Sequence, residues 1–229
     1  MDKNTSAQVT GSVVVMRKTV VVVGLLLSTW VGADSPVVPV GEFSQGQLQG
    51  WEAKVFSGKT DYQLVKENGQ TVLKASSKSA ASGLTRKIRI DLDKTPFLNW
   101  SWRVDKRLGK QDEQTKAGDD YAARLYVVVD GGLLVWRSKA VNYVWSSNQT
   151  RGKAWGNAFL PDNAKMLAVR GVQDKPGGWV QEKRNVKADF KTLFGEDIRY
   201  IDGVALMTDT DNGKGEVTAA YGDVFFSGK

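Results

Sequence analysis

The sequence contains no cysteine and no histidine. On its own the chain therefore forms no disulfide, thiolate nucleophile, Cys/His zinc site or Ser-His-Asp triad. A bound metal would have to be a hard cation held by oxygen ligands, such as calcium. Acid–base chemistry is left to Asp, Glu, Lys, Tyr and Arg side chains.

The sequence also lacks an apolar run long enough to span a membrane. The apolar run near the N-terminus covers only residues 19–27. A span needs about 20 residues. The run follows a basic pair and precedes small residues that end at Ala33, which predicts a signal peptide cleaved there rather than a membrane anchor. We interpret Met16 as the true start and residues 1–15 as a start-site extension. The expected location is periplasmic or secreted, with no transmembrane span in the mature chain.

Acidic residues are in the minority, and the formal charge of the chain is +7. Removing residues 1–33 takes away three basic side chains and one acidic side chain, which leaves +5. A modest positive charge favours anionic partners such as acidic glycans, although ordinary solubility is an equal explanation. The basic residues are scattered along the chain, so no nucleic-acid partner is expected.

Short alternating strands dominate the rest of the chain. Residues 98–104 alternate between apolar and polar side chains, and Asn68 and Gly69 separate two apolar runs as a tight hairpin turn does. Apolar residues at helical spacing predict one short helix over 186–194. About ten strands without β-α alternation predict an all-β antiparallel sandwich of the jelly-roll type over residues 43–229, after a linker at 34–42.

Several motifs resemble a known family. They are WSWRV at 100–104, AGDDYAARLYV at 117–127, NYVWSS at 142–147, RNV at 184–186 and LMTDTDN at 206–212. Together they resemble the bacterial exported family known as domain of unknown function 3047, over most of the mature chain. The resemblance implies a secreted or periplasmic single-domain protein and brings no activity with it. DGV at 202–204 and YGDV at 221–224 are more faintly similar to galactose-binding-like jelly rolls and carbohydrate-binding modules.

The stretch 119–130 is the strand around which we organise the candidate site. Alternation places an apolar set on one face (Tyr121, Ala123, Leu125, Val127, Val129) and a mixed set on the other (Asp120, Ala122, Arg124, Tyr126, Val128). A face that carries Asp, Arg and Tyr is not simply buried. It is therefore the candidate site.

Polar members of other alternating strands extend this face if the strands share a sheet. The candidate ligand-binding residues are Arg103, Asp120, Arg124, Tyr126, Asn142 and Arg170. Arginine binds carboxylates bidentately, and aromatic rings stack on sugars, so such a face would suit an acidic glycan. The alternative is a buried polar network in which the arginines pair with Asp119, Asp120, Asp209 or Asp211.

The aspartate pairs Asp119–Asp120 and Asp209–Asp211 allow three interpretations. Asp209 and Asp211 are candidate calcium ligands, although Gly213 comes one residue too early for an EF-hand loop. The same segment is typical of a hairpin turn with solvated carboxylates. Two carboxylates placed across a glycosidic bond can also hydrolyse it. No cofactor is expected, with calcium as the possible exception.

Trp145, Trp155 and Trp179 stand in or beside loops. Exposed tryptophans there would serve as sugar platforms, whereas buried ones would close the ends of the core.

The sequence thus favours a non-catalytic extracytoplasmic domain that binds a carbohydrate. One alternative is a polysaccharide lyase, in which Tyr126 moves the proton and Arg103, Arg124 or Asn142 neutralises the uronate carboxylate. The other is an envelope protein-interaction module with no small ligand.

Overall fold

The computed structural model describes residues 35–109, 111–133 and 137–229. The expected signal peptide and start-site extension at 1–33 lie outside the described residues. Residues 35–229 form one compact unit. None of the helices in the described ranges is long and apolar enough to cross a membrane.

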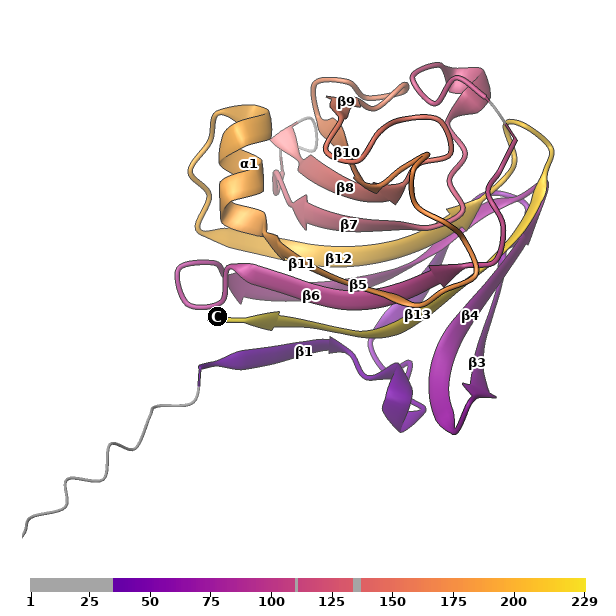
Figure 1. The fold of residues 1–229 in the computed structure, drawn as a ribbon. Coiled ribbons are helices and arrows are strands. Elements are labelled where there is room, and N and C mark those ends of the chain that lie inside the picture. Colours follow the sequence, from indigo (N-terminus) through magenta and orange to yellow (C-terminus); the bar gives the residue numbers. More distant parts are fainter. Residues whose placement is uncertain (1–34, 110, 134–136) are drawn as a thin grey trace, which may run out of the picture. The chain divides into compact units, whose positions relative to one another are not determined.

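Two sheets pack face to face as a sandwich (Figure 1). The first sheet has the order β11-β6-β13-β4-β3, and β1 pairs with β13 beside it. Its strands are β1 (Val37–Gly41), β3 (Asp61–Glu67), β4 (Gln70–Lys78), β6 (Phe97–Val104), β11 (Val180–Asn185) and β13 (Glu216–Ser227).

The second sheet has the order β2-β5-β12-β7-β8-β10-β9. Its strands are β2 (Trp51–Ser57), β5 (Ala81–Asp91), β7 (Arg124–Val129), β8 (Lys139–Trp145), β9 (Ala154–Gly156), β10 (Ala164–Arg170) and β12 (Tyr200–Asp209). Three helical elements complete the described chain: the 3-10 turns η1 (Phe43–Gln45) and η2 (Lys116–Gly118), and the helix α1 (Val186–Phe194).

The all-β sandwich with one short helix is confirmed, with two corrections. The strands β8 and β10 are parallel, so the second sheet is not wholly antiparallel. The expected linker at 34–42 is instead mostly β1, which pairs with the end of β13. Pro39 fits there because an edge strand needs fewer backbone donors than a central one.

Local sequence signals explain the hairpin and the helix. Asn68 and Gly69 both have positive φ, 49° and 85°, and they join β3 to β4 as a tight turn. The Asn185 side chain caps α1 by accepting a hydrogen bond from the backbone N–H of Ala188 at 3.0 Å. Gly195, with φ 75°, ends the helix in the left-handed conformation.

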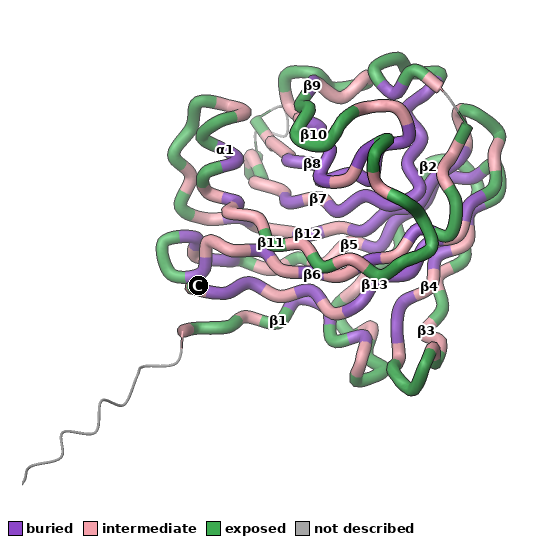
Figure 2. The backbone as a smooth tube through the Cα atoms, viewed as in Figure 1, coloured by how far each residue is buried: buried purple, intermediate pink, exposed green. Residues whose placement is uncertain are grey.

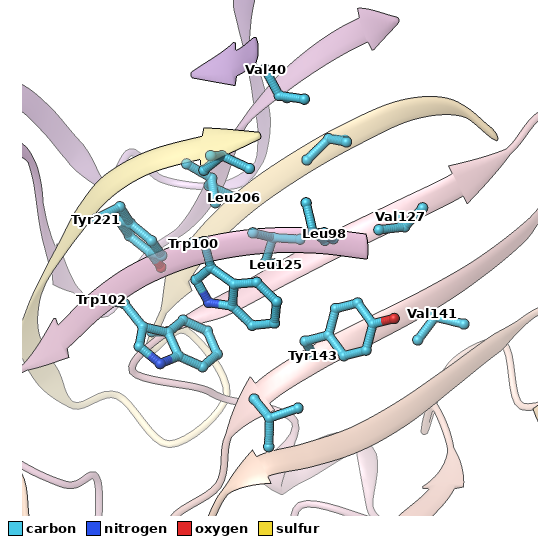
Figure 3. Packing of buried hydrophobic residues seen from close by; sticks show 14 of the residues in the cluster. Val40, Leu98, Trp100, Trp102, Leu125, Val127, Val141, Tyr143, Leu206 and Tyr221 are labelled. Carbon is cyan, nitrogen blue, oxygen red and sulfur yellow. The ribbon is translucent and has the colours of Figure 1, made fainter. Parts of the chain in front are cut away.

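The core lies between the sheets and follows the alternation of the strands (Figure 2). Trp100 and Trp102 of β6 are buried, and their rings meet edge to face with centroids 5.4 Å apart. Tyr143 of β8 reaches Trp100 from the second sheet at the same centroid distance (Figure 3). Each such ring buries about 150–250 Å², so these side chains hold the two sheets together.

Candidate functional site

The strand β7 presents its polar face away from the core, as expected. Leu125 and Val127 pack between the sheets, while Arg124 and Tyr126 lie on the outer face of the second sheet. The strand begins at Arg124 rather than at 119. Alternation therefore does not reach back to Tyr121, which belongs to a separate buried cluster on the outer side and packs over the Arg124 guanidinium at 4.7 Å.

A pocket of about 450 Å³ opens over this face, and we call it the second-sheet pocket. Its floor comes from β7, β8 and β12, and its rim comes from β2 and the loop before β10. The lining residues are Phe56, Ser57, Ala81, Asp119, Arg124, Tyr126, Ala140, Asn142, Asn157, Phe159, Leu160, Ala164, Met207, Asp209, Asp211 and Asn212.

Arg124 is buried and fully engaged by carboxylates. Its Nε donates to Asp209 Oδ1 at 2.9 Å, and its Nη2 donates to Asp209 Oδ2. Its Nη1 also lies 3.5 Å from Asp119 Oδ2. The guanidinium therefore has no free edge for a ligand carboxylate, as in the buried polar network that was the alternative prediction.

Asn157 connects this ion cluster to the rim. Its Nδ2 donates to both carboxylate oxygens of Asp119, at 3.2 and 3.3 Å. Its Oδ1 accepts from the backbone N–H groups of Phe159 and Leu160, at 3.0 and 3.1 Å. One amide side chain thus fixes the loop that presents the half-exposed Phe159 ring at the mouth of the pocket.

Asn142 and Tyr126 retain hydrogen-bonding capacity within the pocket. Asn142 is 1% exposed, and its Oδ1 accepts no hydrogen bond from any residue that the structure describes. Tyr126, the residue opposite Asn142 on β7, donates its phenol to the Met207 sulfur at 3.4 Å. A thioether is a weak acceptor, so a better acceptor from a ligand would replace it readily.

Burial shifts the ionisation of the acidic and phenolic groups here. It acts to raise the pKa of the Asp209 carboxyl, and the bidentate Arg124 guanidinium opposes the rise by stabilising the ionised form. It raises the pKa of Asp119 as well, against Arg124 and Asn157. Burial also raises the pKa of Tyr126 far above its ordinary value, which keeps the phenol protonated at neutral pH.

Asp120, Asp209 and Asp211 bring carboxylate oxygens within 4.8 Å of one another. Asp120 already accepts from the backbone N–H groups of Asn212 and Gly213, at 3.0 and 2.6 Å. Asp209 is taken by Arg124, whose positive charge would repel a cation. Calcium requires six to eight oxygen ligands, so this arrangement favours ion-pair and turn roles for the cluster.

Comparison with known proteins places the chain in a family. Residues 49–225 match the family described as "Protein of unknown function (DUF3047)". The chain belongs to this DUF3047 family. No match was found among curated protein sequences.

Solved structures similar to this DUF3047 member include the following two. The family 11 carbohydrate-binding module of the cellulosomal cellulase Lic26A-Cel5E of Clostridium thermocellum has 8% identity and a TM-score of 0.48, over 85% of this chain and 95% of that one. The xyloglucanase domain of NopAA, a type three effector from Sinorhizobium fredii, in complex with cellobiose, has 10% identity and a TM-score of 0.45, over 77% and 92%.

The DUF3047 fold separates two of the candidate ligand residues from the pocket. Arg103 lies on the outer face of the first sheet, where Glu67 and Asp105 pair with it. Arg170, at the end of β10, pairs with Glu182 of β11. The single face expected for all candidates is therefore wrong for these two, while Arg124, Tyr126 and Asn142 line the pocket and Asp120 adjoins it.

Of the three tryptophans that the sequence offered as sugar platforms or core residues, two are buried and one is exposed. Trp145 and Trp155 are buried, in the main core and the outer cluster respectively. Trp179 is 37% exposed on the outer side of the first sheet. The sequence did not identify Asn157 and Phe159 as site residues. Their one sequence signal is weak: Phe159 is an aromatic residue inside a long polar loop.

Proposed function

We propose that this protein binds a carbohydrate in the second-sheet pocket. The observation that carries the proposal is the unpaired Asn142 Oδ1 on the pocket floor, beside the weakly bonded Tyr126 phenol. A buried acceptor without a donor costs about 1–3 kcal/mol. A ligand hydroxyl that donates to Asn142 and accepts from Tyr126 would recover this free energy.

The rim supports a ring-shaped ligand with an apolar face. Phe56 and Phe159 are large exposed side chains at the mouth, and Met207 and Ala164 line the wall. A largely apolar pocket with a few placed polar groups is typical of small-ligand sites. A sugar presents both chemistries, since it has CH-rich faces and hydroxyl edges.

The charge of the pocket favours a neutral sugar over the acidic glycan that the sequence suggested. Arg124 would be the partner of a uronate, and Asp209 and Asp119 occupy it. Asp211 adds a further carboxylate to the lining. The same facts count against the lyase alternative, because Tyr126 is a poor base when burial raises its pKa and Arg124 cannot reach a substrate carboxylate.

The proposal includes an extracytoplasmic location, which rests on the signal-peptide pattern that ends at Ala33. Release of the expressed protein into the periplasm or medium, with an N-terminus at Asp34, is the corresponding measurement. A protein retained in the cytoplasm with an intact N-terminus would contradict it.

Asn142→Leu tests the binding site directly. Leucine has a similar volume and removes the unpaired oxygen, so we expect the free energy of unfolding to be maintained. We expect affinity for the sugar to fall at least about tenfold, because roughly 1.4 kcal/mol of hydrogen bonding is lost. Calorimetry against neutral and acidic oligosaccharides measures the affinity.

Leu133→Ala is the matched control, since Leu133 is fully exposed and does not line the pocket. Its affinity should equal that of the unmodified protein. Full affinity in Asn142→Leu would overturn the proposal, and no binding of any sugar by the unmodified protein would favour a protein partner instead.

A further inference from the structure

The outer face of the first sheet contains a second hollow surface. Two adjoining hollows of about 410 and 480 Å³ share three lining residues, Gln70, Ser101 and Gln181. They therefore form one depression, which we call the first-sheet trough. It crosses β4, β13, β6 and β11, which are neighbours in the sheet (Figure 1). Three strand spacings span about 14 Å, which is longer than one sugar ring.

A glycine keeps the floor of the trough open. The pairing of β13 with β6 shifts register between Tyr221 and Val224, and Gly222 lies at this bulge beside Ser101. A Cβ atom at Gly222 would lie 2.1 Å from Ser101 Oγ. Any larger residue would push Ser101 aside and fill the floor, so the hollow depends on glycine at this position.

The walls carry hydrogen-bonding groups that the protein does not use. The side chains of Gln70, Ser101 and Gln181 make no hydrogen bond with any residue in the described ranges. Gln70 and Gln181 are exposed, on β4 and just inside β11. Amides and a hydroxyl offer both donors and acceptors, which is the capacity that sugar hydroxyls require.

One end of the trough has an aromatic platform in a fixed position. Trp179 lies against the Arg103 guanidinium, which is 5.5 Å from its ring. Arg103 is held in turn by Glu67, at 2.5 and 3.2 Å, and by Asp105 at 2.9 Å. Trp179 is 37% exposed, so part of its ring is accessible for stacking on a sugar.

Charge in the trough is mixed rather than of one sign. Arg103 is paired with two carboxylates, and Asp223 accepts from the Ser44 N–H at 2.8 Å and from its hydroxyl. Lys183 lies over the Phe97 ring at 4.8 Å. The lining holds three carboxylates, Glu67, Glu182 and Asp223, against one lysine, Lys183, so a neutral ligand fits better than an acidic one.

We propose that the first-sheet trough is a second carbohydrate site, one that takes an extended neutral oligosaccharide. Trp179 stacks on one sugar ring, and Gln181, Ser101 and Gln70 bond the hydroxyls of the following units. The site is separate from the second-sheet pocket because the two lie on the outer faces of different sheets. The protein then holds two glycan segments at once.

The test uses neutral cello-, xylo- and manno-oligosaccharides as disaccharides and hexasaccharides. Calorimetry on the unmodified protein should find a hexasaccharide bound at least tenfold more tightly than its disaccharide, because only the longer chain fills the trough. In Trp179→Ala the tight hexasaccharide binding should fall at least tenfold, with circular dichroism and melting temperature unchanged. Gln181→Ala should weaken the same binding to a smaller extent.

Leu133→Ala is again the control, because Leu133 is fully exposed and lines neither the trough nor the second-sheet pocket. It should leave the tight hexasaccharide binding intact, whereas Asn142→Leu should weaken binding at the second-sheet pocket alone. Unchanged hexasaccharide affinity in Trp179→Ala would overturn the trough proposal. Loss of all binding in Asn142→Leu would also overturn the trough proposal, while it would support the pocket proposal. Failure of the trough proposal is therefore distinguishable from failure of the pocket proposal.

Discussion

At the scale of a single residue, Arg124 is a buried charge that two carboxylates neutralise. It is buried with Asp209 and Asp119 against it, and removing one member leaves the others without a counter-charge. We expect Arg124→Met to lower the free energy of unfolding by about 3–5 kcal/mol. Urea denaturation measures the change.

The double variant Arg124→Met, Asp209→Leu separates charge from packing. A buried ion pair replaced by apolar residues of similar volume is often neutral or stabilising. We therefore expect most of the lost free energy of unfolding to return, since Asn157 still donates to Asp119. If the double variant is less stable than Arg124→Met, the cluster acts through shape and not through charge.

Glu113 provides a prediction about pH. It is buried, and burial raises the pKa of its carboxyl above 4.5, although Ser146 and Ser147 donate to it. The folded state therefore holds this proton more tightly than the unfolded state does. The free energy of unfolding should fall as pH rises from about 4.5 through the raised pKa, by about 1.4 kcal/mol for each unit of the shift.

Glu113→Gln removes this titration and keeps the shape of the side chain. We expect its free energy of unfolding to change less over the same pH range. The measurement is urea denaturation at several pH values on both proteins. A parallel pH profile in the two proteins would show that other carboxyls set the dependence.

Which residues share a face was predictable within one strand and only in part between strands, since Asn142 joins Arg124 and Tyr126 but Arg103 does not. Alternation placed Arg124 and Tyr126 together, because neighbouring side chains of a strand depend on local geometry alone. It placed Arg103 on a polar face as well, but it could not tell that β6 and β7 belong to different sheets. That information resides in pairings between distant segments.

At the scale of elements, the loop between β12 and β13 decides whether the acidic cluster takes calcium. Backbone N–H groups of this loop already donate to Asp120, and Arg124 donates to Asp209. We therefore expect millimolar calcium or a chelator to leave the melting temperature unchanged. A rise with calcium that is absent in Asp211→Asn would establish the cation site instead.

Elements with local signals were predictable, and those that depend on a distant partner were not. The Asn68–Gly69 turn and the capped helix α1 are each determined by a few adjacent residues. The strand β1 has two prolines in or beside it, and it is a strand because the far end of the chain pairs with it. The parallel pairing of β8 with β10 likewise needs the intervening β9 hairpin, which sequence periodicity does not reveal.

The whole molecule has its two candidate surfaces on opposite faces of one rigid core. The main core lies between the sheets, where Trp100, Trp102 and Tyr143 pack against one another (Figure 3). A substitution in the second-sheet pocket should accordingly leave the trough unchanged, since no described contact joins Asn142 to Trp179.

The pairing of β1 with β13 joins the two ends of the described chain. β1 pairs with β13 from Val37 opposite Ser227 to Gly41 opposite Val224, and Val40 is completely buried. A chain that lacks residues 1–33 retains β1, whereas one that lacks residues 1–41 loses it. Burial of a valine contributes about 1.5–3 kcal/mol, so we expect the melting temperature of the shorter chain to be lower by roughly 3–12 °C. Differential scanning calorimetry on the two chains measures both melting temperatures. Equal values would show that β1 adds no stability, as expected for the linker that the sequence predicted at 34–42.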